Sequence, residues 1–222
     1  MNWGNNNNLY TISDHYFFNL LFFVINGVYI PKFETEYIIY LFQKEINNEN
    51  ILNVVDVCGG TGCIAITIKK LFPLKEVWIL EKNILAIQNI LININYHNVQ
   101  INLIKEDVFK IKTINSENTL IICNPPYIKT KDVEKITNKN NLLHNLDGGY
   151  DGLKYVKYIL KHFKDKYFIF ELGYNTQVKY IYKKYQEEFY IISHKPIDNM
   201  DVFFVFLIRK SKYLHYLPLN DN

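Results

Sequence analysis

The sequence predicts an α/β fold in which a mostly parallel, seven-stranded sheet is covered by helices on both faces. From residue 51 onward, short apolar segments alternate with amphipathic segments, as in repeated strand and helix units. Several apolar segments are nearly continuous, which is typical of parallel strands because both of their faces are buried. A glycine-rich turn directly after the first apolar segment fits the connection from strand to helix in such a fold.

Composition indicates one main domain in a reducing compartment. The 222-residue chain is 49% hydrophobic, which is enough for one substantial core. Its 25 Lys and Arg nearly balance 22 Asp and Glu, and the formal charge of +3 neither requires nor excludes a nucleic-acid partner. Cys58, Cys63 and Cys123 lack the spacing of a metal site or a disulfide framework, so we expect free thiols and no metal.

The N-terminal region is predicted to lie outside the sheet. Residues 1–14 are expected to be a loose polar tail, because they include four successive asparagines. The apolar stretch 16–30 is too short to span a bilayer, and the pair Asn26-Gly27 predicts a hairpin between strands 20–25 and 28–30. Residues 35–45 have apolar side chains at helical spacing. Residues 15–46 are therefore expected to form a hairpin and a helix that pack on the main domain.

The main domain is predicted to comprise residues 47–210, followed by a C-terminal tail, residues 211–222. Its expected strands are residues 51–57, 77–80, 99–104, 120–123, 167–172, 189–193 and 202–208. Its expected helices are residues 64–72, 83–96, 153–163 and 176–188, and the polar residues 129–145 are expected to form a loop. Ligands of such folds bind beyond the carboxyl ends of the strands.

Three sequence features at that edge suit a nucleotide-like ligand. Residues 56–62, which begin with Asp56 and include Gly60 and Gly62, form a glycine-rich turn whose backbone can approach a ligand closely. Glu81 ends the second strand and is placed to accept hydrogen bonds from ribose hydroxyls. Asp107 follows the third strand and could accept from an adenine amino group. Each could be an ordinary turn residue, but their shared edge favours a binding site.

The Asn-Pro-Pro-Tyr segment (residues 124–127) directly follows the predicted strand 120–123. The prolines hold Asn124 and Pro125 extended, so the Asn124 side-chain oxygen and the Pro125 carbonyl can converge on one planar NH2 group. An NH2 group held in this way has its nitrogen lone pair directed towards an electrophile. This chemistry suits N-methylation of glutamine or adenine, with Tyr127 as a flat wall.

Five motifs, in order, resemble those of the PrmC or HemK-type glutamine N5-methyltransferases, which modify class I peptide-chain release factors with S-adenosylmethionine. Residues 30–36 resemble the family's I-P-R-x-x-T-E, residues 56–66 its cofactor loop, and residues 124–128 its N-P-P-Y-I. Residues 147–153 resemble its G-G-x-D-G-L, and residues 170–177 its E-x-G-x-x-Q. The resemblance covers residues 17–210 and implies a Rossmann-like class I S-adenosylmethionine-dependent methyltransferase fold.

The resemblance also implies roles for individual residues. The cofactor S-adenosylmethionine would be bound by Asp56, Gly60, Gly62, Glu81, Asp107, Val108 and Asn124. The catalytic residues would be Asn124, Pro125 and Tyr127, and the substrate would contact these three, Pro126, Thr35 and Glu36. The expected substrate is the glutamine of the GGQ motif in a class I release factor. The chain is expected to act as a cytoplasmic monomer, without a membrane and without nucleic acid as direct substrate.

Three departures from the family leave other functions open. The family arginine is Lys32, its Glu-Pro pair is Asn141-Leu142, and only about thirty residues precede Pro31 where the family has an N-terminal helical domain. One alternative is glutamine methylation of a large-subunit ribosomal protein. Others are adenine N6-methylation of DNA or RNA, and a degenerate cofactor-binding protein without turnover.

Overall fold

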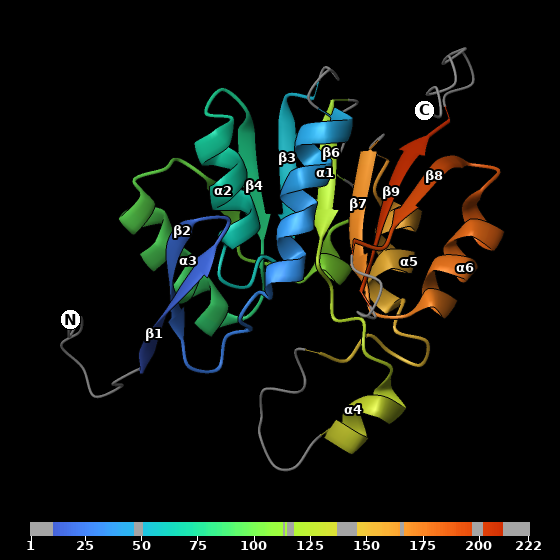
Figure 1. The fold of residues 1–222 in the computed structure, drawn as a ribbon, viewed down its shortest axis with the longest axis horizontal. Helices are drawn as coiled ribbons and strands as arrows, with labels where there is room; N and C mark the ends of the chain where they lie inside the picture. The colour runs from blue at the N-terminus through green and yellow to red at the C-terminus, as the bar shows by residue number, and fades with distance from the viewer. Residues whose placement is uncertain are drawn as a thin grey trace.

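A seven-stranded sheet forms the centre of the computed structural model, which describes residues 11–46, 51–112, 114, 118–136, 146–164, 167–196 and 202–210 (Figure 1). In sheet order the strands are β5 (Asn102–Ile104), β4 (Glu76–Leu80), β3 (Asn53–Val57), β6 (Thr119–Cys123), β7 (Tyr167–Leu172), β9 (Phe203–Arg209) and β8 (Phe189–His194). β9 runs antiparallel to both of its neighbours, and the other pairs are parallel. The predicted mostly parallel, seven-stranded sheet is confirmed.

The register brings the carboxyl ends of the central strands to one level. Val57 of β3 lies beside Leu80 of β4 and Cys123 of β6. The chain continues from β3 to β4 and β5 on one side and then returns to β6 on the other, so β3 and β6 flank the switch point of the sheet. Such a switch point is where doubly wound sheets bind their ligands.

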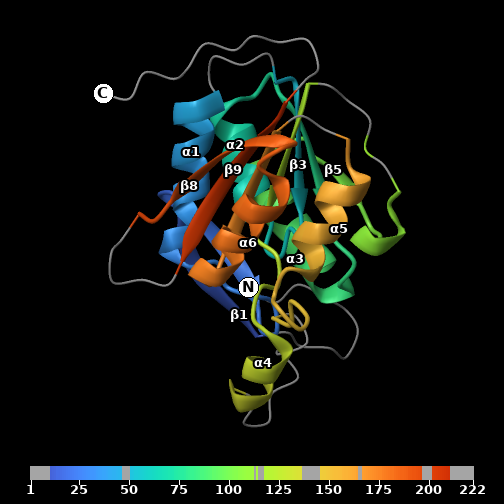
Figure 2. The same ribbon diagram turned by 90° about the vertical axis from the view of Figure 1, so that its right-hand side faces the viewer.

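Helices cover both faces of the sheet, as predicted (Figures 1 and 2). One face packs against α1 (Tyr37–Ile46), α2 (Cys63–Leu71) and α3 (Ile84–His97), and the other against α5 (Lys154–His162) and α6 (Asn175–Tyr185). Successive side chains of a strand alternate between the faces. Val54 thus lies in the first core cluster, and Val55 lies in the second.

The N-terminal hairpin consists of β1 (Ile12–Phe17) and β2 (Leu20–Ile25), so its predicted position around Asn26-Gly27 is wrong. Phe18 and Asn19 have φ angles of 48° and 59°, the left-handed pair that a tight two-residue hairpin turn requires. Gly27, with a φ of 101°, instead turns the chain away from the end of β2. Residues 12–14, which were expected in the loose tail, belong to β1, whereas residues 1–10 and 211–222 lie outside the described residues.

Buried asparagines attach this hairpin to the main domain. Asn89 and Asn93 on α3 are fully buried, and their side-chain oxygens accept hydrogen bonds of 2.8 Å from the backbone of Ile25 and Phe23. The amide of Asn93 also donates to the Thr61 carbonyl at 2.9 Å. One helix therefore holds both the hairpin and the glycine-rich turn.

The segment after β6 differs from the prediction. Residues 130–136 form a helix, α4 (Thr130–Ile136), where a polar loop was expected. The Thr130 hydroxyl donates to the Asp147 carboxylate at 2.8 Å, and Val133 is buried, so this amphipathic stretch gains tertiary support that its polar composition does not reveal. Two short 3-10 helices, η1 (Phe33–Glu36) and η2 (Val108–Lys110), complete the elements. Asn141-Leu142 lies outside the described residues.

Candidate functional site

A cavity of about 490 Å³ opens beyond the carboxyl ends of the central strands. Most of the residues predicted for the site line it: Gly60, Glu81, Asp107, Val108, Asn124, Pro125, Pro126 and Tyr127. Its volume lies in the range of about 300–1,000 Å³ that is typical of small-molecule sites. The switch point between β3 and β6 therefore carries a ligand-sized cavity.

Three residues of the glycine-rich turn beside the cavity have a left-handed backbone conformation. Cys58, Gly60 and Gly62 have φ angles of 64°, 56° and 81°. A Cβ atom added at Gly60 would meet no atom within 4 Å, so the backbone there borders open space. Gly62 precedes the first residue of α2 and does not line the cavity. The predicted close approach of backbone to ligand is therefore possible at Gly60.

Asp56, predicted to bind the cofactor, lies beneath the turn and is not part of the cavity lining. Its side chain is 1% exposed, and its Oδ2 atom accepts a hydrogen bond of 3.3 Å from the Ala65 amide in α2. Burial raises the pKa of Asp56 to about 7, although the Ala65 amide acts in the opposite direction. This position identifies Asp56 as a support for the turn and the start of α2.

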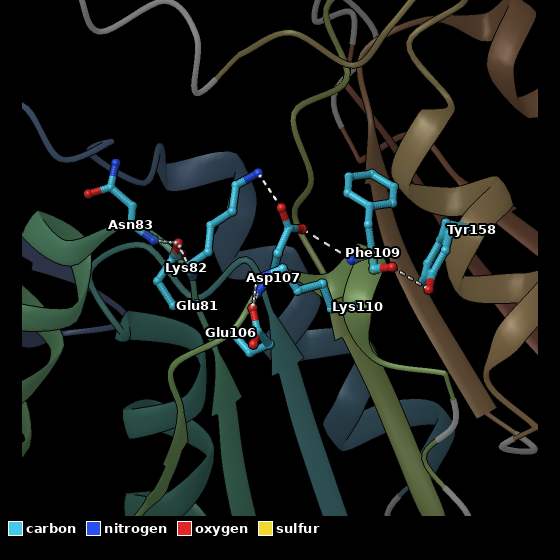
Figure 3. Close-up of polar contacts among 8 residues, drawn as sticks. All are labelled: Glu81, Lys82, Asn83, Glu106, Asp107, Phe109, Lys110 and Tyr158. Carbon is cyan, nitrogen blue, oxygen red and sulfur yellow. Dashed lines mark hydrogen bonds and ion pairs between the residues drawn. The ribbon is translucent and has the colours of Figure 1, made fainter.

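Glu81 lines the cavity, and its carboxylate is held by backbone amides, two of which are those of Lys82 and Asn83 (Figure 3). Its Oε2 atom accepts from the Gly60 amide at 3.1 Å. Its Oε1 atom accepts from the amides of Lys82 and Asn83 at 2.8 and 2.9 Å. These bonds orient the carboxylate while leaving further acceptor capacity on its oxygens, as binding of a pair of ribose hydroxyls would require.

Asp107 borders the same side of the cavity and is fixed by two contacts (Figure 3). Its Oδ1 atom accepts from the Phe109 amide at 3.1 Å, and its Oδ2 atom forms an ion pair with Lys82 at 3.0 Å. Partial burial acts to raise the pKa of Asp107, but the Phe109 amide and Lys82 together lower it. The group is therefore an ionised acceptor at neutral pH.

The Asn-Pro-Pro-Tyr segment forms the opposite side of the cavity. Asn124 follows the last residue of β6, and its Nδ2 atom donates to the Thr35 hydroxyl at 3.3 Å. The Tyr127 hydroxyl donates to Glu171 Oε1 at 3.4 Å. Burial raises the pKa of Tyr127, and the nearby Glu171 charge adds to this effect, so the phenol remains neutral.

Residues far along the chain brace this segment from behind. Gln177 Nε2 donates to the Tyr127 carbonyl at 2.9 Å, and Gln177 Oε1 accepts from the Gly173 amide at 3.1 Å. A Cβ atom at Gly152 would lie 2.1 Å from the Tyr127 carbonyl oxygen, and one at Gly173 would lie 2.6 Å from the Tyr127 ring. The motifs at residues 147–153 and 170–177 thus both pack against Tyr127 and hold it in place.

Two of the predicted substrate-binding residues do not line the cavity. Thr35 is fully buried behind Asn124, and Glu36 Oε1 accepts from the Phe18 amide at 2.9 Å in the hairpin turn. Thr35 therefore contacts the cavity lining through Asn124, and Glu36 contacts the hairpin. Direct contact of either residue with a substrate stays a prediction.

Several lining residues were missed by sequence reasoning. Gly27, Val28 and Tyr29 line the cavity from the segment after the hairpin, and Tyr155 lines it from α5. The segment 27–29 precedes the family-like motif at residues 30–36, which was the available signal, but the misplaced hairpin assigned it to a strand. Only the tertiary structure shows that Tyr155 lines the cavity.

The described residues include no group of three or more His, Cys, Asp or Glu side chains that could hold a metal ion. Cys58, Cys63 and Cys123 are free thiols. In the part of the chain that the structure describes, no helix has the length and apolar character needed to cross a membrane.

Solved structures with similar folds are methyltransferases. The human METTL16 catalytic domain in complex with the MAT2A 3'UTR hairpin 6 matches with a TM-score of 0.63 at 14% identity, over 82% of this chain and 73% of that one. Ribosomal protein L11 methylase from Lactobacillus delbrueckii subsp. bulgaricus matches with a TM-score of 0.59 at 18% identity, over 85% and 84%. Together with the observed topology, these likenesses define a Rossmann-like class I S-adenosylmethionine-dependent methyltransferase fold.

Sequence relatives narrow this class. The model of the methyltransferase small domain matches residues 35–145. Two relatives are named release factor glutamine methyltransferase. The one from Thermodesulfovibrio yellowstonii is 31% identical to this chain, and the match covers 72% of this chain and 59% of the relative. The one from Clostridium botulinum is 30% identical, and the match covers 79% of this chain and 67% of the relative. The chain belongs to the family of release factor glutamine methyltransferases. It spans less than two thirds of the length of the Thermodesulfovibrio relative, and 46% of that from Flavobacterium psychrophilum.

Proposed function

We propose that this protein transfers a methyl group from S-adenosylmethionine to the side-chain amide nitrogen of a protein glutamine, namely the GGQ glutamine of a class I release factor. The observation that carries the proposal is that Asn124 and Glu81 line one cavity and follow β6 and β4, the strands on either side of β3. An acceptor held at Asn124 would meet a cofactor held at Glu81. The names of the relatives support a glutamine as acceptor.

Several lining residues support S-adenosylmethionine as the ligand of the cavity. Glu81 would bind the ribose, Asp107 and Val108 would lie at the adenine, and the open backbone at Gly60 would border the ligand. When bound, the cofactor supplies an electrophilic methyl group on a positively charged sulfur. The carboxylate oxygens of Glu81 and Asp107 suit a ligand with hydroxyl and amino donors.

The chain's own contribution is the orientation of the acceptor amide. Asn124 Oδ1 and the Pro125 carbonyl would each accept one N–H of the glutamine NH2 group, which aims the nitrogen lone pair into the cavity. A general base is not needed before transfer, because the amide nitrogen becomes acidic as its new bond forms and then releases a proton. Positioning and hydrogen bonding therefore supply the catalysis.

A methyl-transfer assay tests the proposal and separates the acceptors. The purified chain is incubated with labelled S-adenosylmethionine and, in separate reactions, a class I release factor, large ribosomal subunits and DNA or RNA, and the methyl group is located by mass spectrometry. We expect N5-methylglutamine in the GGQ motif. Methyl label on a ribosomal protein or on adenine, with none on the release factor, would overturn the proposed acceptor. Cofactor binding without transfer to any of them would indicate a protein without turnover.

A further inference from the structure

Glu171 is a buried carboxylate behind the Asn-Pro-Pro-Tyr segment, and it has no part in the mechanism so far. It lies in β7 and is 1% exposed. Its Oε1 atom accepts from the Tyr127 hydroxyl at 3.4 Å, whereas its Oε2 atom has no hydrogen-bond partner among the described residues. Buried charges without good partners are costly, so such a group directly behind the cavity-lining Tyr127 points to a role in function.

The groups around Glu171 come from several elements. Burial raises its pKa to about 7, and the Glu34 charge adds to this effect. The hydroxyls of Thr35 and Tyr127 act in the opposite direction by hydrogen bonding, as does the positive charge of Lys32. Tyr29 also faces the carboxylate, and its pKa is raised by burial and by the Glu171 charge. The pKa of Glu171 therefore lies near neutral pH, and the Thr35 hydroxyl is one of the groups that favour its ionised form.

The Thr35 hydroxyl connects this carboxylate to Asn124. A hydroxyl has one proton to donate, and an ionised carboxylate can only accept. When Thr35 donates to Glu171, its oxygen can only accept from Asn124, as the Nδ2 to Oγ1 distance of 3.3 Å allows. The Asn124 amide then has its NH2 group towards Thr35 and its Oδ1 atom towards the cavity. Oδ1 accepts no hydrogen bond from any residue that the structure describes.

We propose that Glu171, acting through the Thr35 hydroxyl, orients the Asn124 side-chain amide so that its oxygen faces the acceptor NH2 group. Glu171 and Thr35 are thus positioning residues, and this role rests on the proposed function. The same carboxylate holds the Tyr127 hydroxyl, so one buried group sets both side chains of the acceptor site.

Residue 171 must accept a hydrogen bond from Thr35, because donation in the opposite direction would reverse the Asn124 amide. A protonated Glu171, or a glutamine there, can donate to Thr35, which then donates to the Asn124 oxygen. The Asn124 amide would turn its NH2 group into the cavity, where it would face the donor NH2 of the substrate. Two donor groups cannot bind each other, so the acceptor would be lost although every residue of the Asn-Pro-Pro-Tyr segment remains.

The test combines two variants with a matched control. Thr35→Val removes only the hydroxyl, Thr35→Ser keeps it, and Thr67→Val removes a hydroxyl from another fully buried threonine, in α2. With a class I release factor as acceptor, we expect Thr35→Val to lower kcat about 10- to 100-fold, with the affinity for S-adenosylhomocysteine changed less than about twofold. Thr35→Ser should restore most of the rate, and Thr67→Val should resemble the wild type. A Thr35→Val rate within about threefold of wild type would overturn the proposal.

A second measurement does not depend on the acceptor. In nuclear magnetic resonance spectra of the isotope-labelled protein, the Asn124 side-chain NH2 protons should show a nuclear Overhauser effect to the Thr35 side chain, and Glu171→Gln should abolish it. Absence of this effect in the wild type would overturn the orientation itself. If it is present but the release factor is not methylated, the proposed function fails and the orientation stands.

The pH profile separates positioning from a merely structural role. Because the ionised form of Glu171 is required, the wild-type rate should rise with pH through about 7. Glu171→Gln should be slow, and its rate should lack this rise. A Glu171→Gln variant with the wild-type profile would assign the titration to another group and would contradict the proposal.

Discussion

On the side of the cavity formed by β4 and β5, the carboxylates are held partly by amides next to them in the chain, whereas the side-chain bonds of Asn124 and Tyr127, beyond β6, go to distant residues. Asp107 binds the amide two residues further on, and Glu81 binds the amides of the next two residues. Their remaining partners, Lys82 for Asp107 and the Gly60 amide for Glu81, lie 25 and 21 residues away. By contrast, Asn124 bonds to Thr35, 89 residues away, and Tyr127 bonds to Glu171, 44 residues away.

The two sides also differ in exposure. The side chains of Lys82 and Asp107, which form the ion pair on the cofactor side, are 51% and 26% exposed. On the acceptor side, Thr35 is fully buried and Glu171 nearly so. Substitutions on the cofactor side should therefore change ligand affinity and leave the fold intact. Substitutions on the acceptor side should also disturb the buried contacts of other residues.

The largest effect is expected for Asn124→Ala. Loss of the acceptor oxygen should lower kcat about 1,000-fold, because a preorganised hydrogen-bonding group at the reacting atom is removed. The affinity for S-adenosylmethionine, measured by calorimetry, should change less than about threefold, since Glu81 and Asp107 remain. An equal loss of affinity and rate would show that Asn124 serves the cofactor side as well.

Gly152→Ala should be the most damaging change outside the direct acceptor contacts. Its φ angle is +73°, and the new Cβ would lie 2.1 Å from the Tyr127 carbonyl oxygen and 2.2 Å from Gln177 Nε2. We expect the free energy of unfolding in urea to fall by at least about 3 kcal/mol.

Gly149→Ala is the matched control for that change. Gly149 also has a left-handed φ angle, +88°, but the atoms nearest to the new Cβ belong to the flexible Lys154 side chain, the first of them at 3.2 Å. For Gly149→Ala the free energy of unfolding should fall by only about 1 kcal/mol, the cost of backbone strain alone. Equal losses for the two variants would contradict the role of Gly152 in holding Tyr127.

Glu171→Gln should stabilise the fold as pH rises. The folded-state pKa of about 7 lies above the ordinary value of 4.5, so the neutral form favours folding. This contribution is complete below the ordinary value and is lost as pH rises through about 7, with an upper bound of roughly 3 kcal/mol. The glutamine variant cannot ionise and should gain unfolding free energy relative to wild type between about pH 5 and about pH 8 in urea titrations. A constant difference across this range would contradict the shifted pKa.

Glu81→Ala should act on cofactor affinity first. The loss of charged acceptor groups should weaken S-adenosylmethionine binding about 10- to 100-fold in calorimetry. Glu76→Ala, at the exposed start of the strand that precedes Glu81, is the control and should leave affinity unchanged. A normal affinity with a lower kcat at saturating cofactor would remove Glu81 from the ribose site.

The smallest effect is expected for Lys82→Met. The ion pair with Asp107 joins partly exposed groups, so its loss should change the free energy of unfolding by less than about 1 kcal/mol. Cofactor affinity should change little at moderate salt, because solvent and ions screen such pairs. A loss comparable to that of Gly152→Ala would contradict the contrast between the two sides.

The sequence predicted the sheet well because its strands are apolar and end at recognisable turns. It misplaced the hairpin, since Asn26-Gly27 is the stronger local turn signal while the tertiary bonds of Asn89 and Asn93 hold residues 20–25 as the inner strand. It also missed α4, whose support comes from Asp147 and from burial of Val133. Local signals fail where a distant contact decides between two local structures.

In the candidate site too, local sequence predicts some residue positions and tertiary packing decides others. Gly60, Glu81, Asp107 and Asn124 follow strands, and the shared edge of parallel strands brings them together whatever the details of packing. Asp56 also follows the pattern of a strand end, but the packing of α2 buries it beneath the turn. Periodicity could place such residues at the edge, although it could not say which of them face the cavity.

By itself, the sequence determined the sheet, the edge at which the site lies and the chemical character of the Asn-Pro-Pro-Tyr segment. Only the tertiary structure decided that Thr35, Glu171, Gly152 and Gln177 converge behind that segment. The physical reason is that strand-end residues are set by backbone pairing. Hydrogen bonds between side chains many residues apart exist only after the helices and loops have packed on the sheet.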